Sequence, residues 1–179
     1  MKLSDFYIGL EFFASAGFVW RCTDVGTRTI TAIQIEEGRD AIWYNGPPYS
    51  VAETVFDEHD LPRCHLSFND AIEDAIHEAD TSGHPGFLDK AVSRMMREQF
   101  SSQMTKYRNN GLLRFDRVRG DGELLHPYAA KKSGDSWNVR LYLPFVNEYA
   151  EISELEFLGL PIATNSDVKQ RAKANSIKS

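Results

Sequence analysis

Side chains that could carry acid–base or metal chemistry gather in one short segment, between Asp57 and His65. The run Asp57-Glu58-His59-Asp60 is followed by Cys64-His65. Carboxylates and imidazoles act as general acids and bases, and they bind metal ions whose bound water can attack a substrate. The spacing matches no closed zinc pattern, and neighbouring strand residues point to opposite faces, so only alternate members could converge. We therefore name Asp57, His59 and His65 as candidate catalytic residues, assign no metal site and leave any cofactor open; charged residues in a solvated loop are the simpler interpretation.

The two cysteines of the chain, Cys22 and Cys64, differ in their surroundings. Cys64 lies between Arg63 and His65, a positive setting that would lower the pKa of its thiol and favour a nucleophile. Cys22 shares a strand face with Trp20, which favours a small buried side chain. Two cysteines without a CxxC pair are too few for a disulfide framework, so we expect a reduced, cytoplasmic protein.

A loop rich in proline is flanked by aromatic residues. Asn45-Gly46-Pro47-Pro48 is a strong loop signal, because glycine permits unusual dihedral angles and proline lacks a backbone donor. Aromatic side chains beside rigid prolines lose little entropy on binding and form good anchors. We predict that Trp43, Tyr44 and Tyr49 contact a partner protein; the alternative is that their rings only plug the loop.

The N-terminal third of the chain has the pattern of a small sheet. Within residues 6–60, Trp20 and Cys22 alternate with Val19 and Arg21 at the period of a half-buried strand. Several short strands joined by tight turns predict a strongly bent antiparallel sheet or a partial barrel.

Helices and further strands are expected after this sheet. Ser67 resembles a helix cap, and the apolar residues behind it recur at helical spacing. The expected segments are helices at 67–80 and 86–109, strands over 112–158 with the last at Ile152 to Leu158, and a frayed helix or disordered tail at 164–179. Strands, then helices, then strands predict an α+β fold with a single domain over residues 1–163.

The formal net charge of −6 conceals an uneven distribution. Residues 1–80 hold 15 acidic and 5 basic side chains, whereas residues 88–140 hold 6 acidic and 11 basic ones. Basic side chains neutralise phosphates and exposed aromatic rings stack on bases, so the 88–140 segment could bind nucleic acid. The candidate binding residues there are Arg94, Arg97, Arg114 and Lys131. The alternative is that these cations pair with the acidic N-terminal half.

Composition excludes several classes of protein. With 42% hydrophobic and 26% charged residues, the chain has a globular composition. No window approaches the ~20 apolar residues of a bilayer span, so we expect no membrane insertion. The interrupted apolar stretch near the start also lacks the pattern of a secretory signal.

Three stretches within residues 7–60 resemble small accessory proteins encoded on conjugative plasmids and integrative elements. They are Trp20 to Ile30, Trp43 to Tyr49, and Val55 to Glu58. Some accessory proteins of that setting inhibit the transfer of a competing element, by binding its machinery or by acting on DNA. The resemblance implies a biological setting and assigns no catalytic residue.

Two functions are therefore expected. The first is a regulatory or inhibitory binding protein of a mobile genetic element, acting through protein–protein contacts. The alternative is a nucleic-acid or nucleotide-processing enzyme, similar to a nuclease or ATPase, that holds phosphate on the basic 88–140 surface. In that case Asp57, His59 and His65 would supply acid–base or metal chemistry.

Overall fold

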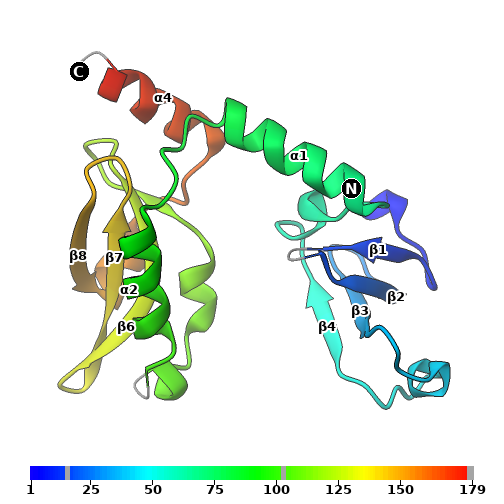
Figure 1. Cartoon of the computed structure of the whole chain (residues 1–179). Coiled ribbons are helices and arrows are strands. Elements are labelled where there is room, and N and C mark those ends of the chain that lie inside the picture. The colour runs from blue at the N-terminus through cyan, green and yellow to red at the C-terminus, as the bar shows by residue number, and fades with distance from the viewer. Residues whose placement is uncertain (15–16, 102–103, 177–179) are drawn as a thin grey trace. The chain divides into compact units, whose positions relative to one another are not determined.

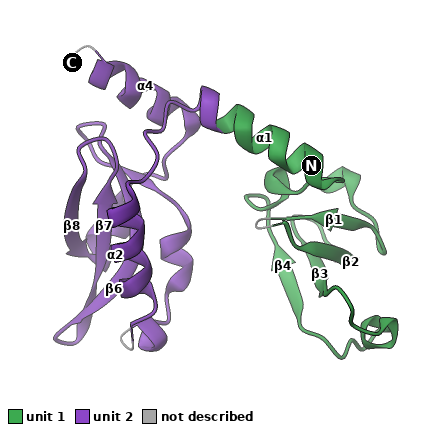
Figure 2. Cartoon of the chain, in the orientation of Figure 1, with its two compact units in different colours: residues 1–78 green, residues 79–179 purple. Residues whose placement is uncertain are grey.

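The computed structural model describes residues 1–14, 17–101 and 104–176 (Figure 1). The chain divides into two compact units, Met1–Glu78 and Ala79–Ser179 (Figure 2), and each is described by itself. The single domain expected over residues 1–163 stays a prediction. Some residues of the expected segments lie outside the described ones, namely 15–16 of the β-rich segment, 102–103 of the second helix and 177–179 of the tail.

Unit 1 is built on an open, four-stranded antiparallel sheet in the order β1-β2-β3-β4. Its strands are β1 (Glu11–Phe13), β2 (Val19–Val25), β3 (Ile30–Ile35) and β4 (Glu53–Phe56). One face of this sheet buries a core around Phe12, which has no exposed surface. The Phe12 ring meets Phe6 and Phe56 edge to face, with centroids 5.1 and 5.4 Å apart.

Helix α1 (Phe68–Thr81) follows the sheet and confirms the helix expected over 67–80. Ser67 begins it as predicted, since its hydroxyl accepts a hydrogen bond of 3.1 Å from the backbone N–H of Asp70. The apolar stripe of the helix is nevertheless exposed at Phe68, Ile72 and Ile76. Its periodicity therefore predicted a helix without showing what the stripe packs against.

Unit 2 is built on a second antiparallel sheet, in the order β5-β6-β7-β8. Its strands are β5 (Arg117–Val118), β6 (Leu124–Ser133), β7 (Ser136–Leu143) and β8 (Glu148–Ser153). Helix α2 (Asp89–Gln99) buries Ala91 and Met95 against Tyr128 and Tyr142 of the sheet. A second cluster of the same unit packs Phe157 of helix α3 (Glu154–Gly159) against strand residues, Val139 among them. The α+β class is thus confirmed by two sheets and four α-helices in the described part of the chain.

The long helix expected over 86–109 is wrong in its second half. Helix α2 ends at Gln99, and 3-10 turns follow at Met104–Lys106 and Asn110–Arg114. Phe100, just beyond the helix, is 83% exposed, and Met96 one turn earlier is 51% exposed. Since helices of this length depend on tertiary burial, the lack of a buried face beyond Met95 accounts for the early end.

The strand expected at Ile152 to Leu158 is also wrong. The chain leaves β8 at Ser153, whose hydroxyl accepts a hydrogen bond of 3.2 Å from the N–H of Glu156. Serine in this role begins a helix, and α3 occupies the residues that follow.

The C-terminal segment forms helix α4 (Asn165–Ser176). Thr164 and Asp167 cap it reciprocally, with Asp167 Oδ2 accepting from the Thr164 N–H at 2.8 Å. Arg171 holds the helix to the sheet by an ion pair of 2.7 Å with Glu123, both side chains being largely buried. The Arg171 guanidinium also lies 5.3 Å from the centre of the Phe145 ring. No described helix is long and apolar enough to cross a bilayer.

Replacing Arg171 by alanine should destabilise unit 2, because it leaves the Glu123 carboxylate buried without a counter-charge. Breaking a buried pair on one side lowers the free energy of unfolding by about 3 kcal/mol. The matched control is Arg119→Ala, which breaks the exposed ion pair with Asp121 and should cost less than about 1 kcal/mol. Chemical denaturation measures both losses, and equal losses would contradict the assignment of Arg171 as the anchor of α4.

Candidate functional site

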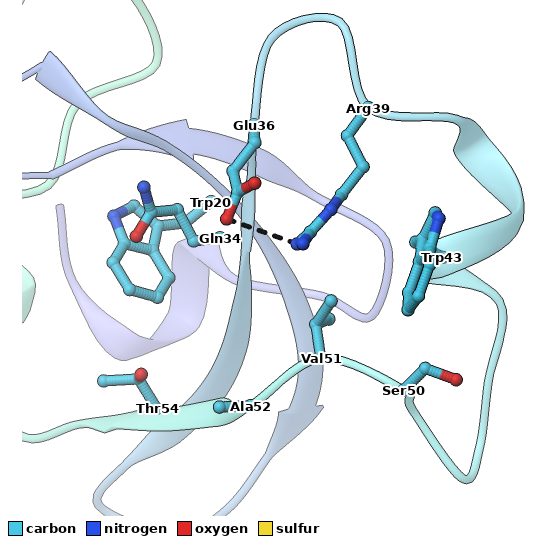
Figure 3. A pocket seen from close by; sticks show the side chains of 9 residues that line it. All are labelled: Trp20, Gln34, Glu36, Arg39, Trp43, Ser50, Val51, Ala52 and Thr54. Atoms are coloured by element: carbon cyan, nitrogen blue, oxygen red, sulfur yellow. Dashed lines mark ion pairs between the residues drawn. The ribbon is translucent and has the colours of Figure 1, made fainter.

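A groove in unit 1 joins the sheet to the proline-rich loop (Figure 3). We call it the Trp groove. Its lining residues are Trp20, Gln34, Glu36, Arg39, Trp43, Ser50, Val51, Ala52 and Thr54. Its volume is about 310 Å³, and it contains both tryptophans of unit 1.

The sheet forms one wall of the Trp groove. Trp20 of β2 lies opposite Gln34 of β3, and Thr54 of β4 lies opposite Ala32, so all these side chains share one face. The hydrophobic core covers the other part of that face, and Trp20 meets it at Phe56 with ring centroids 5.0 Å apart. The groove is therefore the portion of the sheet face that the core leaves open.

The loop between β3 and β4 forms the other wall. Its 3-10 turn, Ala41–Tyr44, is capped by Asp40, which accepts a hydrogen bond of 3.0 Å from the N–H of Ile42. Tyr44 is buried, and its hydroxyl accepts from the Glu36 N–H at 2.7 Å. These bonds fix the turn that carries Trp43. Gly46 is required next in the loop, since a Cβ there would lie 2.4 Å from the Tyr49 ring.

The two charged side chains of the Trp groove, Arg39 and Glu36, form an ion pair, whereas one buried polar atom has no hydrogen-bond partner among the described residues. Arg39 lies 3.2 Å from the Glu36 carboxylate and 5.2 Å from the centre of the Trp43 ring (Figure 3). This double contact fixes the guanidinium over the indole, where cation–π attraction adds to the ion pair. Trp20 Nε1, in contrast, is buried without an acceptor among the described residues.

The three aromatic residues named as partner contacts have different surroundings. Trp43 is 48% exposed and lines the Trp groove, whereas Tyr44 is buried and supports the turn. Tyr49 is half-buried beside Gly46. Trp20 and Arg39 were missed as groove residues, although the alternation of Trp20 with Arg21 indicated its sheet face.

Asp57 and His59 lie in one turn, whereas His65 lies in a separate backbone bridge to Phe13. Asp57 and its neighbours form a turn, in which Asp57 Oδ1 accepts from the His59 N–H at 2.9 Å and Asp60 Oδ2 accepts from the Asp57 N–H at 3.0 Å. His65 instead pairs its backbone with Phe13, and its Nε2 lies 3.8 Å from Asp74 Oδ2. Among the described residues, no three His, Cys, Asp or Glu side chains are placed to hold a metal ion. The hydrogen bond between Asp57 and His59 stabilises the turn, and the catalytic role of Asp57, His59 and His65 stays a prediction.

The expected low pKa of Cys64 is wrong. Its side chain is buried in the core of unit 1, and burial raises the pKa of its thiol to about 11. Burial likewise raises the pKa of Cys22. A protonated, buried thiol is a poor nucleophile, because the thiolate is the reactive form.

The four basic residues named for nucleic acid make contacts within unit 2. Arg94 pairs with Glu98 at 3.0 Å and lies 3.9 Å from the centre of the Tyr149 ring. Lys131 lies 3.7 Å from Glu151. Arg97 donates to the Ser93 carbonyl at 3.2 Å, and the Arg114 guanidinium lies 5.0 Å from the centre of the Phe115 ring. Arg94 and Lys131 therefore belong to local ion pairs, and the binding role of the four basic residues stays a prediction.

An imidazole–carboxylate pair in unit 2 was not anticipated. His126 Nδ1 lies 2.8 Å from Asp116 Oδ1, and the Phe87 ring packs on the imidazole with centroids 4.6 Å apart. His84 lies nearby, and burial lowers its pKa. Residues 116 and 126 meet because β5 and β6 form a hairpin around the turn Gly120-Asp121-Gly122.

Alkylation of Cys64 by iodoacetamide at pH 8 should be at least a hundredfold slower in the native protein than in guanidinium. With a native pKa of about 11 the thiolate fraction at pH 8 is about 10⁻³, against roughly a quarter at the unfolded value of about 8.5. Labelling should become faster as the pH rises toward 11. Peptide mapping by mass spectrometry follows Cys64 and Cys22 separately, and rapid native labelling of Cys64 at pH 8 would restore it as a nucleophile.

The chain was compared with known proteins on three levels. No protein-family model, no curated protein and no solved structure matches it.

Proposed function

We propose that this protein is a regulatory or inhibitory binding protein that acts through protein–protein contacts. Its Trp groove takes an extended segment of the partner. The observation that carries the proposal is the exposed indole of Trp43, held rigidly at a groove that runs beside strand β4. The setting in a mobile genetic element is part of the proposal and depends on the resemblance within residues 7–60.

Strand β4 offers a backbone edge to such a segment. It pairs with β3 on one side, and no other described strand pairs with it on the other. Glu53, Thr54 and Val55 are all exposed, and Val55 presents 60% of its surface. An extended peptide that adds to a free sheet edge gains main-chain hydrogen bonds, while neighbouring pockets select its side chains.

Trp43 is suited to be the anchor of this contact. The cap from Asp40 and the buried Tyr44 fix the 3-10 turn, and Arg39 lies over the indole. A side chain that is already ordered loses little entropy on binding. Tryptophan is also enriched among the few interface residues that supply most of the binding free energy.

The charge of unit 1 favours a basic partner. Residues 1–78 contain 14 acidic and 5 basic side chains. Complementary charge speeds association and disfavours acidic competitors.

Trp43→Ala should weaken partner binding at least tenfold, as expected for loss of an aromatic anchor worth about 2 kcal/mol. Short random peptides displayed on phage are selected on the full-length protein and then resynthesised with a fluorescent label. Fluorescence anisotropy gives their dissociation constants, and the selected peptides should be enriched in lysine and arginine.

The matched control is Ile42→Ala, which removes an exposed side chain of the same turn that does not line the groove. It should change the dissociation constants less than twofold. Bound peptide should also slow hydrogen exchange of the β4 amides. Peptides that bind both variants equally, or that leave β4 unprotected, would place the interface elsewhere.

A further inference from the structure

A second cavity lies entirely within unit 2 and has the opposite charge from unit 1. We call it the basic pocket, and it has a volume of about 400 Å³. It lies where the chain between α2 and β5 meets the turn between β6 and β7. Three cations line it, namely Lys106, Arg108 and Lys132.

These three cations are uncompensated. All are exposed, and none forms an ion pair within the described parts of the chain. The neighbouring residue Lys131, in contrast, forms an ion pair with Glu151 at 3.7 Å. Adjacent strand residues point to opposite faces, so the sheet separates the paired lysine from the unpaired one. Three cations around a single exposed acid, Asp135, favour an anionic ligand.

An aromatic platform stands among these cations. Trp137 of β7 lies directly opposite Lys132 in the strand register and is half-buried. Its ring packs on Tyr107, with centroids 5.1 Å apart and planes at 57°. Tyr107 is itself fixed, because its hydroxyl donates to Glu154 at 2.8 Å and Asn109 donates to the same oxygen at 2.7 Å. The Tyr107 ring, which these hydrogen bonds hold in place, therefore supports one side of the Trp137 indole.

We propose that the basic pocket binds a nucleotide, with the base stacked on Trp137 and the phosphate held by Lys106, Arg108 and Lys132. Base–aromatic stacking combined with phosphate neutralisation is the usual chemistry of single-strand binding. The cavity volume lies in the range of small-molecule sites, large enough for one nucleotide unit. The same chemistry fits a free mononucleotide and one residue of a single strand. The site is separate from the Trp groove and does not depend on its function.

The acidic residue Asp135 affects the affinity of the basic pocket for phosphate. Asp135 lines the basic pocket and is exposed. Its charge opposes phosphate binding in proportion to its proximity. Removing that charge should therefore strengthen binding, an effect opposite in sign to the loss of any pocket cation.

Binding is measured on the full-length protein with three probes, namely AMP, a short fluorescent oligodeoxyadenylate and inorganic phosphate. Lys132→Ala should weaken binding of the nucleotide probe three- to tenfold, and Trp137→Ala at least fivefold. Asp135→Asn should strengthen it about twofold. The matched control, Lys131→Ala, removes the same charge from the paired neighbour and should leave affinity within twofold. Trp137→Phe keeps a stacking ring and should retain most of the affinity, which guards against misfolding of the alanine variant.

Salt and the three probes complete the test. Neutralising one phosphate of a single strand predicts a slope of about −0.7 in log affinity against log salt, and Lys132→Ala should reduce its magnitude. If AMP binds as well as the oligonucleotide, the ligand is a free nucleotide; if only the oligonucleotide binds, it is a single strand. Inorganic phosphate binding as tightly as AMP, equal effects of the two lysine variants, or no binding of either nucleotide probe would overturn the proposal.

Discussion

The packing of Phe12 between Phe6 and Phe56 determines what unit 1 can present to a partner. These rings and their neighbours bury one part of a small sheet face, and Trp20 marks where that burial stops. Strands of three to seven residues cannot cover a whole face with their own connections. The uncovered remainder, bounded by a loop that Tyr44 and Asp40 hold in place, is the Trp groove. The groove is thus a by-product of incomplete burial of the sheet face.

In unit 2 the cations that already form ion pairs with carboxylates differ from those that could bind an anionic ligand. Glu98 and Glu151 form a chain of ion pairs with Arg94, Arg140 and Lys131 that spans α2, β6, β7 and β8. These residues stabilise the packing of the helix on the sheet and have little charge left for a ligand. A count of charges along the sequence treats Lys131 and Lys132 as equivalent. The two lysines differ because neighbouring strand residues point to opposite faces of the sheet.

The fold class and the first helix could be predicted from local patterns, because alternation and capping involve residues close in sequence. Ser67 and Asp70 show this for α1. The failures depend on distant partners. The extent of α2 depends on which of its side chains meet Tyr128 and Tyr142, and the order of α4 depends on Glu123, 48 residues from Arg171.

The candidate sites show the same division. The pattern around Trp43 predicted an aromatic anchor, and hydrogen bonds of Asp40 and Tyr44 hold the 3-10 turn that carries it. Which of the three rings is available was decided by the hydrogen bond from the Glu36 N–H to Tyr44, a contact that composition does not reveal. Cys64 was judged from Arg63 and His65 beside it in sequence, although its environment is the apolar core around Phe12. Neighbours in sequence predict chemistry poorly wherever the side chain turns inward.

The unequal charges of the two units constrain how nucleic acid could be bound at all. Residues 1–78 carry 14 acids against 5 bases, whereas residues 79–179 carry 12 against 15. An acidic unit repels a polyanion, so phosphate contact is restricted to the few uncompensated cations of unit 2. The basic pocket supplies three cations, which release few counterions, and counterion release supplies most of the non-specific affinity of nucleic-acid-binding proteins. Stacking on Trp137 must then contribute a large share of the binding free energy, which favours a short, base-dependent contact over a broad electrostatic one.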